Sequence, residues 1–345
     1  MDGGLLRAIE KKTGVRDLAG LLADRLSGSE LSSLMLEVYG QKTGKMKPAE
    51  LLVQYRCNRL VQPSELEMIG LLESELAVLR FFRDRGFLPV QLSPVTALGC
   101  CSVVAAVSQD KIVSAVRNTE IVADATNSLA LHVAALRKGS GNPAAGEEVD
   151  DGSRGEEVLR LSTVHRHVRT QPFADKRFLP HFTIACMVTA GKDRGSYGFE
   201  CAGMAEHIAI YVDLLRDFFG VEQFRVLLKR RMGYDERNPL IDKIELSLRQ
   251  RLEGVVLERE GPERSEGSER GEARARSFDE SSPPENAYYK GVQFKLYIIV
   301  GGAEWEIADG GFVAWTEPLR GNRKERFLIR GFGLELLFKI QQGLL

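Results

Sequence analysis

A row of polar side chains ends one of the strands that the sequence predicts. The segment Arg166-His167-Val168-Arg169-Thr170-Gln171 closes a β-rich run. Because side chains alternate across a strand, His167, Arg169 and Gln171 fall on one face and Arg166 falls on the other. A guanidinium binds phosphates and carboxylates through paired hydrogen bonds, so a row centred on Arg169 suits a nucleotide phosphate or a carboxylate. A solvated face of an antiparallel sheet would carry the same pattern without a ligand.

The next strand begins at His181-Phe182-Thr183-Ile184, after a loop over residues 172–180. We expect the two strands to pair in antiparallel fashion. This arrangement resembles motif 2 of the class II aminoacyl-tRNA synthetases, in which an arginine and a nearby Glu or Gln are followed by a variable loop and then by an aromatic strand. The resemblance implies that Arg169 is catalytic and holds the α-phosphate of ATP, and that Gln171 contacts the adenine amine.

Further segments resemble, in the same order, those of the histidyl-tRNA synthetase branch, which includes the regulatory subunit of ATP phosphoribosyltransferase. They are an Asp-x-Thr turn before a helix, a Tyr-Tyr-x-Gly-x-x-Phe segment, a glycine-rich strand, and the glycine-rich turn of motif 3. The resemblance implies substrate contacts from Asp124, Thr126, Tyr288, Tyr289 and Gly311. It implies nucleotide contacts from Arg169, Gln171, Arg330, Gly331 and Gly333.

Motif 3 departs from the family at its arginine. In the active synthetases this arginine contacts the γ-phosphate, and this chain has Leu336 in its place. Without that cation the pyrophosphate leaving group loses charge stabilisation that typically contributes several kcal/mol. Arg330, directly before Gly331, is the candidate substitute. Neither the histidine-specific signature nor an anticodon-binding domain is recognisable, so we do not expect the chain to charge tRNA.

Three functions therefore stay open on the sequence, because a fold resemblance alone does not decide function. The first is an enzyme that binds ATP with Mg²⁺ and an amino acid or related carboxylic acid, and forms an acyl-adenylate for a non-tRNA acceptor such as an acceptor protein. The second is an inactive paralogue that serves as a regulatory subunit or amino-acid receptor for a partner enzyme. The third is an interaction or structural protein with a vestigial pocket. No Cys/His/Asp cluster predicts a metal site of the protein's own.

The elements that must position these residues are predicted from hydrophobic periodicity. Apolar residues recur at helical spacing from Leu5 to about Phe82, which predicts a helical extension over residues 1–62. Short runs rich in Val, Ile and Phe follow and predict strands, one of them from Ser102 to Val107. We expect residues 63–345 to form one α+β domain, with an antiparallel mixed sheet flanked by helices, as in the class II synthetases.

Two charged, glycine-rich segments interrupt this domain, at about 138–157 and about 258–285. They contain little that a core could bury, so we interpret both as exposed insertions and the second as disordered. Surface loops tolerate added length at small entropic cost, which makes insertions within one domain a better interpretation than linkers between domains.

Composition limits the partners. The 345 residues are 43% hydrophobic, enough for a large core, and 47 Lys and Arg nearly balance 48 Asp and Glu. Such a balance creates no overall field toward nucleic acid or an anionic membrane. No apolar run reaches the roughly 18 residues of a membrane span. We expect a cytoplasmic protein with no membrane partner.

A homodimer is expected from the resemblance. The predicted helix from Glu65 to Arg83 and the strand from Phe87 to Pro94 occupy the position of motif 1. Class II domains dimerise through that motif about a two-fold axis.

Overall fold

The computed structural model describes residues 3–138, 158–171, 175–234, 239–252, 255–259 and 288–345. The chain divides into two compact units. The first comprises Met1–Glu65, Ser93–Ala123 and His167–Phe182, and the second comprises Leu66–Leu92, Asp124–Arg166 and Thr183–Leu345. The segments predicted as exposed insertions lie almost entirely outside the described residues.

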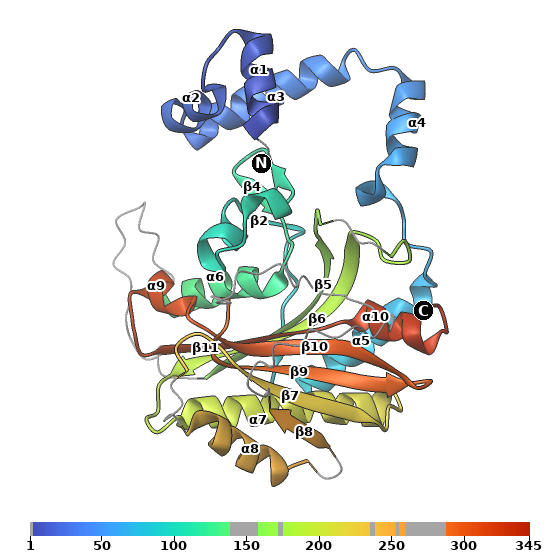
Figure 1. Ribbon diagram of the computed structural model, residues 1–345, viewed down its shortest axis with the longest axis vertical. Helices are drawn as coiled ribbons and strands as arrows, with labels where there is room; N and C mark the ends of the chain where they lie inside the picture. Colours follow the sequence, from blue (N-terminus) through green and yellow to red (C-terminus); the bar gives the residue numbers. More distant parts are fainter. Residues whose placement is uncertain (1–2, 139–157, 172–174, 235–238, 253–254, 260–287) are drawn as a thin grey trace, which may run out of the picture. The chain divides into compact units, whose positions relative to one another are not determined.

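A sheet of eight strands organises the second unit (Figure 1). Its order is β1-β5-β6-β11-β10-β9-β7-β8. β1 pairs parallel with β5, and β7 with β8, whereas β6, β11, β10, β9 and β7 pair antiparallel in turn. The strands are β1 (Leu88–Pro89), β5 (Leu159–Val168), β6 (His181–Lys192), β7 (Phe224–Arg230), β8 (Val256–Arg259), β9 (Lys290–Val300), β10 (Ala303–Val313) and β11 (Glu325–Phe332). This mainly antiparallel sheet with flanking helices is the predicted α+β class.

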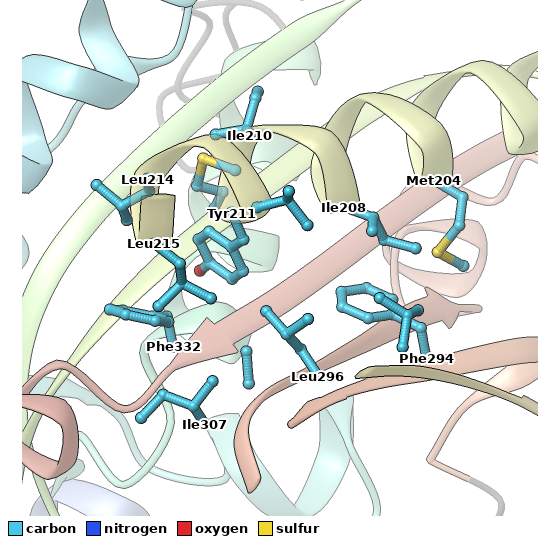
Figure 2. Close-up of a cluster of buried hydrophobic side chains, with 14 of the residues drawn as sticks. Met204, Ile208, Ile210, Tyr211, Leu214, Leu215, Phe294, Leu296, Ile307 and Phe332 are labelled. Carbon is cyan, nitrogen blue, oxygen red and sulfur yellow. The ribbon is translucent and has the colours of Figure 1, made fainter. Parts of the chain in front are cut away.

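The main core lies between this sheet and helix α7 (Gly198–Asp213). Helices α7 and α8 (Leu240–Arg249) cover one face of the sheet (Figure 1). Figure 2 shows Met204, Ile208 and Tyr211 of α7 directed at Phe294 and Phe332 of the sheet, and all five side chains are buried. Each fully buried side chain of this size contributes about 1.5–3 kcal/mol. This packing makes the sheet a rigid support for what lies on its other face.

Helix α6 (Ala125–Lys138) lies on the other face (Figure 1). Near its end, Arg137 donates to Glu325 at the start of β11 (2.6 Å) and to the Ala190 carbonyl of β6 (3.0 Å). Arg320, which ends the short helix α9 (Thr316–Arg320), also pairs with Glu325 (3.1 Å). Glu325 is fully buried, so the two guanidinium groups supply the compensation that a buried carboxylate needs. The ion pairs anchor α6, whose first turn carries Thr126.

Two further helices complete the second unit. They are α5 (Met68–Arg83) and α10 (Leu334–Gln341), which contact one another. The inward face of α5 buries Leu71, Val78 and Phe82. The π-helical turn Leu214–Phe218 extends α7.

The first unit begins with four helices, which confirms the helical periodicity of that region. They are α1 (Gly3–Thr13), α2 (Leu18–Arg25), α3 (Gly28–Thr43) and α4 (Pro48–Cys57), and none of them contains a buried residue. α3 begins with a capping box in which Ser27 and Glu30 satisfy each other's backbone N–H. A three-stranded sheet of order β2-β4-β3 follows, formed by Val95–Ala97, Thr119–Ile121 and Ser114–Ala115.

Segments distant in sequence join this unit. Arg59 donates to the carbonyls of Lys176 (3.1 Å) and Phe178 (2.6 Å), and the ring of His181 bonds to the Gln62 carbonyl (2.6 Å). These contacts link the end of the helical region to residues 167–182.

The predicted strand from Ser102 to Val107 is wrong, because residues Cys100–Val104 form a π-helical turn. Buried Glu120 accepts hydrogen bonds from the N–H groups of Gly99 and Cys101, each 2.9 Å long. Gly99 has a φ of 89°, a conformation that glycine adopts without strain. The Glu120 carboxylate therefore stabilises a turn in this segment, although its β-branched residues alone predict an extended strand.

No helix of the described residues is long and apolar enough to cross a membrane.

Candidate functional site

Asp124 stands at the start of α6 in the second unit and is held through both carboxylate oxygens. Its Oδ1 accepts from the backbone N–H of Thr126 (2.9 Å) and from the Thr126 hydroxyl (2.7 Å). Its Oδ2 accepts from the hydroxyl of Tyr288 (2.8 Å). Acidic residues commonly cap helix starts in this way, since they accept from the first backbone N–H groups. The structure thus joins three of the five predicted substrate residues in one network.

Aromatic rings fix Tyr288 in position. Its ring lies edge-to-face with Tyr289 at 4.8 Å between centroids and with Trp315 at 5.1 Å. Burial and the nearby Asp124 carboxylate raise the pKa of Tyr288 well above its ordinary value. The hydroxyl therefore stays protonated at neutral pH and acts as a donor to Asp124.

A second network extends from Tyr289 across the sheet. The Tyr289 hydroxyl donates to Oδ2 of Asp309 on β10 (2.9 Å), and Nε2 of Gln293 on β9 donates to the same oxygen (3.2 Å). Nε of Arg231 donates to Oε1 of Gln293 (2.7 Å). Because Arg231 must meet the amide oxygen, the NH₂ group of Gln293 is the end that faces Asp309. Burial first, and then the charge of Glu306, raise the pKa of Asp309 to about 6.

Two glycines of β10 allow this close packing. A Cβ added at Gly311 would lie 2.7 Å from Cδ1 of Tyr289 and 2.8 Å from the Val292 carbonyl oxygen. A Cβ at Gly310 would lie 2.5 Å from Cβ of Arg330. Gly311 is buried, so its role in the site is to admit the ring of Tyr289.

A buried carboxylate follows the glycine-rich turn over residues 331–333. Glu335 in the first turn of α10 is 1% exposed and accepts from Arg166 (3.3 Å) and from the Thr183 N–H (3.2 Å), and it pairs with Lys339 (3.1 Å). The Gly333 N–H donates to the Ile307 carbonyl (2.8 Å). These contacts connect the turn to β5, β6 and β10.

Arg330 does not occupy the position that the sequence predicts for a nucleotide contact. Its side chain is fully buried, donates to the carbonyl of His207 and stacks on Tyr211 at 3.0 Å from the ring centroid. Gly331 pairs with Asp309, so by strand alternation Arg330 and Asp309 project from opposite faces of the sheet. Burial lowers the pKa of Arg330 to about 9. The guanidinium thus has no exposed surface for a triphosphate, which corrects its proposed role as a substitute cation.

Arg169 and Gln171 belong to the first unit and lie beyond the end of β5 at Val168. Arg169 donates from its backbone N–H to the Pro180 carbonyl (2.8 Å) and from Nε to the Ala123 carbonyl (3.1 Å). Its guanidinium lies 5.5 Å from the ring of Phe182. The predicted row of three polar residues is not a strand face, because the strand ends within it and His167 is buried.

Sequence patterns missed several polar residues of these networks. Asp309 lies inside the predicted glycine-rich segment and Gln293 inside the Tyr-Tyr segment, but neither has a position that the resemblance marks. Strand alternation predicts that Arg166 faces away from Arg169, and the resemblance assigns it no role, although it binds Glu335. Strand alternation carried part of the signal, because it places Asp309 and Gly311 on one face of β10. Gln293 joins that face only through the pairing of β9 with β10. Within the described part of the chain, no group of three or more His, Cys, Asp or Glu side chains is arranged to hold a metal ion.

The architecture is similar to that of solved synthetase structures. An ATP phosphoribosyltransferase regulatory subunit/histidyl-tRNA synthetase from Bacillus halodurans superposes with a TM-score of 0.55 at 13% identity, over 81% of each chain. A histidyl-tRNA synthetase from S. aureus superposes with a TM-score of 0.54 at 11% identity, over 83% of this chain and 69% of the other. No protein-family model matches the sequence, and no curated protein matches it. At these identities the likeness establishes the fold.

Proposed function

We propose that this chain, which has the fold of the class II aminoacyl-tRNA synthetases, is a receptor for an amino acid or related small acid. The observation that carries the proposal is the Asp124 carboxylate, held at Oδ1 by Thr126 and at Oδ2 by Tyr288. A carboxylate with a fixed orientation is a good acceptor for the three donors of an ammonium group. The ligand's amino group would bind at Asp124 beside the paired rings of Tyr288 and Tyr289.

The residues around motif 3 fit an ATP triphosphate poorly, and this favours a receptor over an adenylate-forming enzyme. The position of the motif 3 arginine is Leu336, and Arg330 is buried against α7. Stabilisation of charge on a departing pyrophosphate needs a cation directed at it. Binding of ATP with Mg²⁺ therefore stays a secondary proposal, supported by Arg169 alone among the predicted arginines.

A regulatory role is the second part of the proposal. One structural neighbour is titled as a regulatory subunit of ATP phosphoribosyltransferase. An amino-acid receptor without the means to activate its ligand would serve such a role. We therefore propose that ligand binding in this chain controls a partner enzyme.

A homodimer through α5 completes the proposal. Outward residues of α5 are unusually exposed for apolar side chains: Met68 is 66% exposed, Ile69 63%, Leu72 45% and Leu76 48%. They follow the helical repeat and form one stripe. Size-exclusion chromatography with light scattering should give a dimer mass, and Leu76→Glu should give a monomer. A wild-type monomer at micromolar concentration would contradict this part.

Ligand binding is tested by thermal shift and calorimetry with a panel of amino acids. A ligand that binds the native state raises its apparent stability. We expect Asp124→Asn to weaken the best ligand by about 10- to 100-fold, since a hydrogen bond to a charged group contributes roughly 1.5–3 kcal/mol. Asp242→Asn is the matched control, because it makes the same chemical change in an exposed pair with Arg259.

ATP–pyrophosphate exchange with the same acids separates the alternatives. Binding without exchange supports the receptor. Exchange that disappears in Arg169→Ala supports the adenylate-forming enzyme. If neither ligand binding nor exchange is detected, the result supports an interaction protein with a vestigial pocket.

A further inference from the structure

We propose that Asp309 selects a ligand with a second positively charged nitrogen, such as the side-chain ammonium of lysine or the guanidinium of arginine. The inference rests on the amino-acid receptor proposed above and names the chemical class of its ligand. In this arrangement Asp124 binds the α-amino group, and Asp309 binds the cationic end of the side chain.

The two carboxylates are connected through a pair of neighbouring tyrosines. Tyr288 donates to Asp124 and Tyr289 donates to Asp309, and the two rings lie 4.8 Å apart edge-to-face. Tyrosine neighbours in sequence thus direct their hydroxyls to different carboxylates. A ligand that reaches both carboxylates would meet an acidic group at each end.

The orientation of Asp309 leaves it suited to accept from a ligand. Within the described part of the chain, its hydrogen bonds from Tyr289 and Gln293 both end on Oδ2, and part of the residue is solvent-exposed. Gln293 is 3% exposed, and Arg231 holds its amide oxygen, so its donor cannot turn away from Asp309 without breaking that bond. The network therefore fixes the carboxylate through one oxygen and directs the other away from those donors.

Local charge favours a cation at Asp309. The charged groups that act on it most are the carboxylates of Glu306 and Asp124 and the ammonium of Lys295. Lys295 is already paired with Glu306 at 3.0 Å, so that pair supplies little net positive charge. Removal from water makes an uncompensated carboxylate costly, and a bound cation would relieve that cost.

The test compares ligands that differ in charge and little else. Calorimetry compares the affinity of lysine with that of norleucine, and the affinity of arginine with that of citrulline. The pH is 7.5, about one and a half units above the pKa of Asp309, so that its carboxylate is charged. We expect the charged member of at least one pair to bind at least about tenfold tighter, and Asp309→Asn to reduce that ratio to about one. Glu304→Gln is the control for net charge, because Glu304 lies on the same strand but pairs with Arg225 away from the site. It should leave the ratio unchanged.

The wild-type protein provides a second test that needs no variant. The pKa of Asp309 is about 6, so its carboxylate becomes protonated as the pH falls through that value. Affinity for the cationic ligand should therefore fall about tenfold per unit below pH 6, whereas affinity for its neutral partner should not. Burial raises the pKa of Tyr289 well above this range, so its hydroxyl does not produce the same profile.

The outcomes separate this inference from the proposal that it rests on. If neutral acids bind as tightly as cationic ones, and Asp124→Asn weakens binding as expected, the receptor stands and the role of Asp309 is refuted. A charge preference that survives in Asp309→Asn refutes it equally. If neither cationic nor neutral acids bind, both the receptor and the inference fail.

Discussion

The substitution Gly311→Ala tests whether strand β10 shapes the ligand site. The added methyl would lie 2.7 Å from Cδ1 of Tyr289, 2.8 Å from the Val292 carbonyl oxygen and 3.1 Å from the Gln293 Cα. Two of these atoms belong to the backbone of the neighbouring strand and cannot rotate away. We therefore expect Tyr289 to be displaced, which breaks its hydrogen bond to Asp309.

The expected loss of stability follows from overpacking, which typically costs about 1–3 kcal/mol. A folding unit of the size of the second one loses about 2–4 °C of Tm per kcal/mol, so the expected decrease is about 2–12 °C. Thermal unfolding followed by circular dichroism measures it. Calorimetry on the folded variant should show weaker binding of the best ligand, because the donor from Tyr289 to Asp309 is lost.

Gly331→Ala is the matched control for stability. Gly331 lies on β11 opposite Asp309, and a Cβ there would meet its nearest atom, Cγ2 of Ile184, at 3.4 Å, an ordinary contact. Its Tm should stay the same or rise slightly, since alanine restricts the unfolded chain more than glycine does. Equal Tm values for Gly311→Ala and the wild-type protein, with ligand affinity unchanged, would refute this account of the site.

Three further predictions concern buried charges. Glu325→Gln should destabilise the protein by about 3–5 kcal/mol in urea unfolding, because it removes the charge that compensates the buried Arg137 and pairs with Arg320. Glu258→Gln at the surface should cost less than about 1 kcal/mol. Arg330→Met should leave amino-acid affinity unchanged in calorimetry, since this side chain is buried against α7; a lost ligand would contradict its placement. Burial alone would raise the pKa of Glu120, but hydrogen bonds from Gln109 and two backbone N–H groups lower this pKa below its usual 4.5. The contribution of Glu120 to stability is therefore present above pH 4.5 and is lost as the pH falls further. Glu120→Gln should make the free energy of unfolding in urea depend less on pH in the acid range.

Much of the architecture could be predicted from local patterns. The helices of the first 83 residues follow from apolar periodicity, and α6 follows from the cap at Asp124. Strand β10 continues through Gly310 and Gly311, although two successive glycines are uncommon inside a strand. β7 and α8 were not anticipated, although α8 has a clear apolar face in Leu240, Ile241, Ile244 and Leu248.

The candidate site could also be predicted from the sequence only in part. Motif order alone selected Asp124, Thr126, Tyr288 and Tyr289, and the structure places them in two adjoining networks. Motif order could not assign Asp309, since its role depends on strand pairing that brings β9 beside β10. It also misjudged Arg330, because one residue of register on β11 decides which face of the sheet a side chain reaches.

The sequence by itself determined the fold class and the order of the segments that resemble synthetase motifs, with Leu336 where that resemblance has an arginine. These features depend on residue identity and spacing along the chain. Tertiary structure decided which charges act together. Arg330 is buried on the core side of the sheet, Arg166 binds Glu335, and Asp309 stands with Tyr289 on the other face. Electrostatic interactions depend on distance and burial in space, and residues far apart in the chain acquire both only when the strands pair.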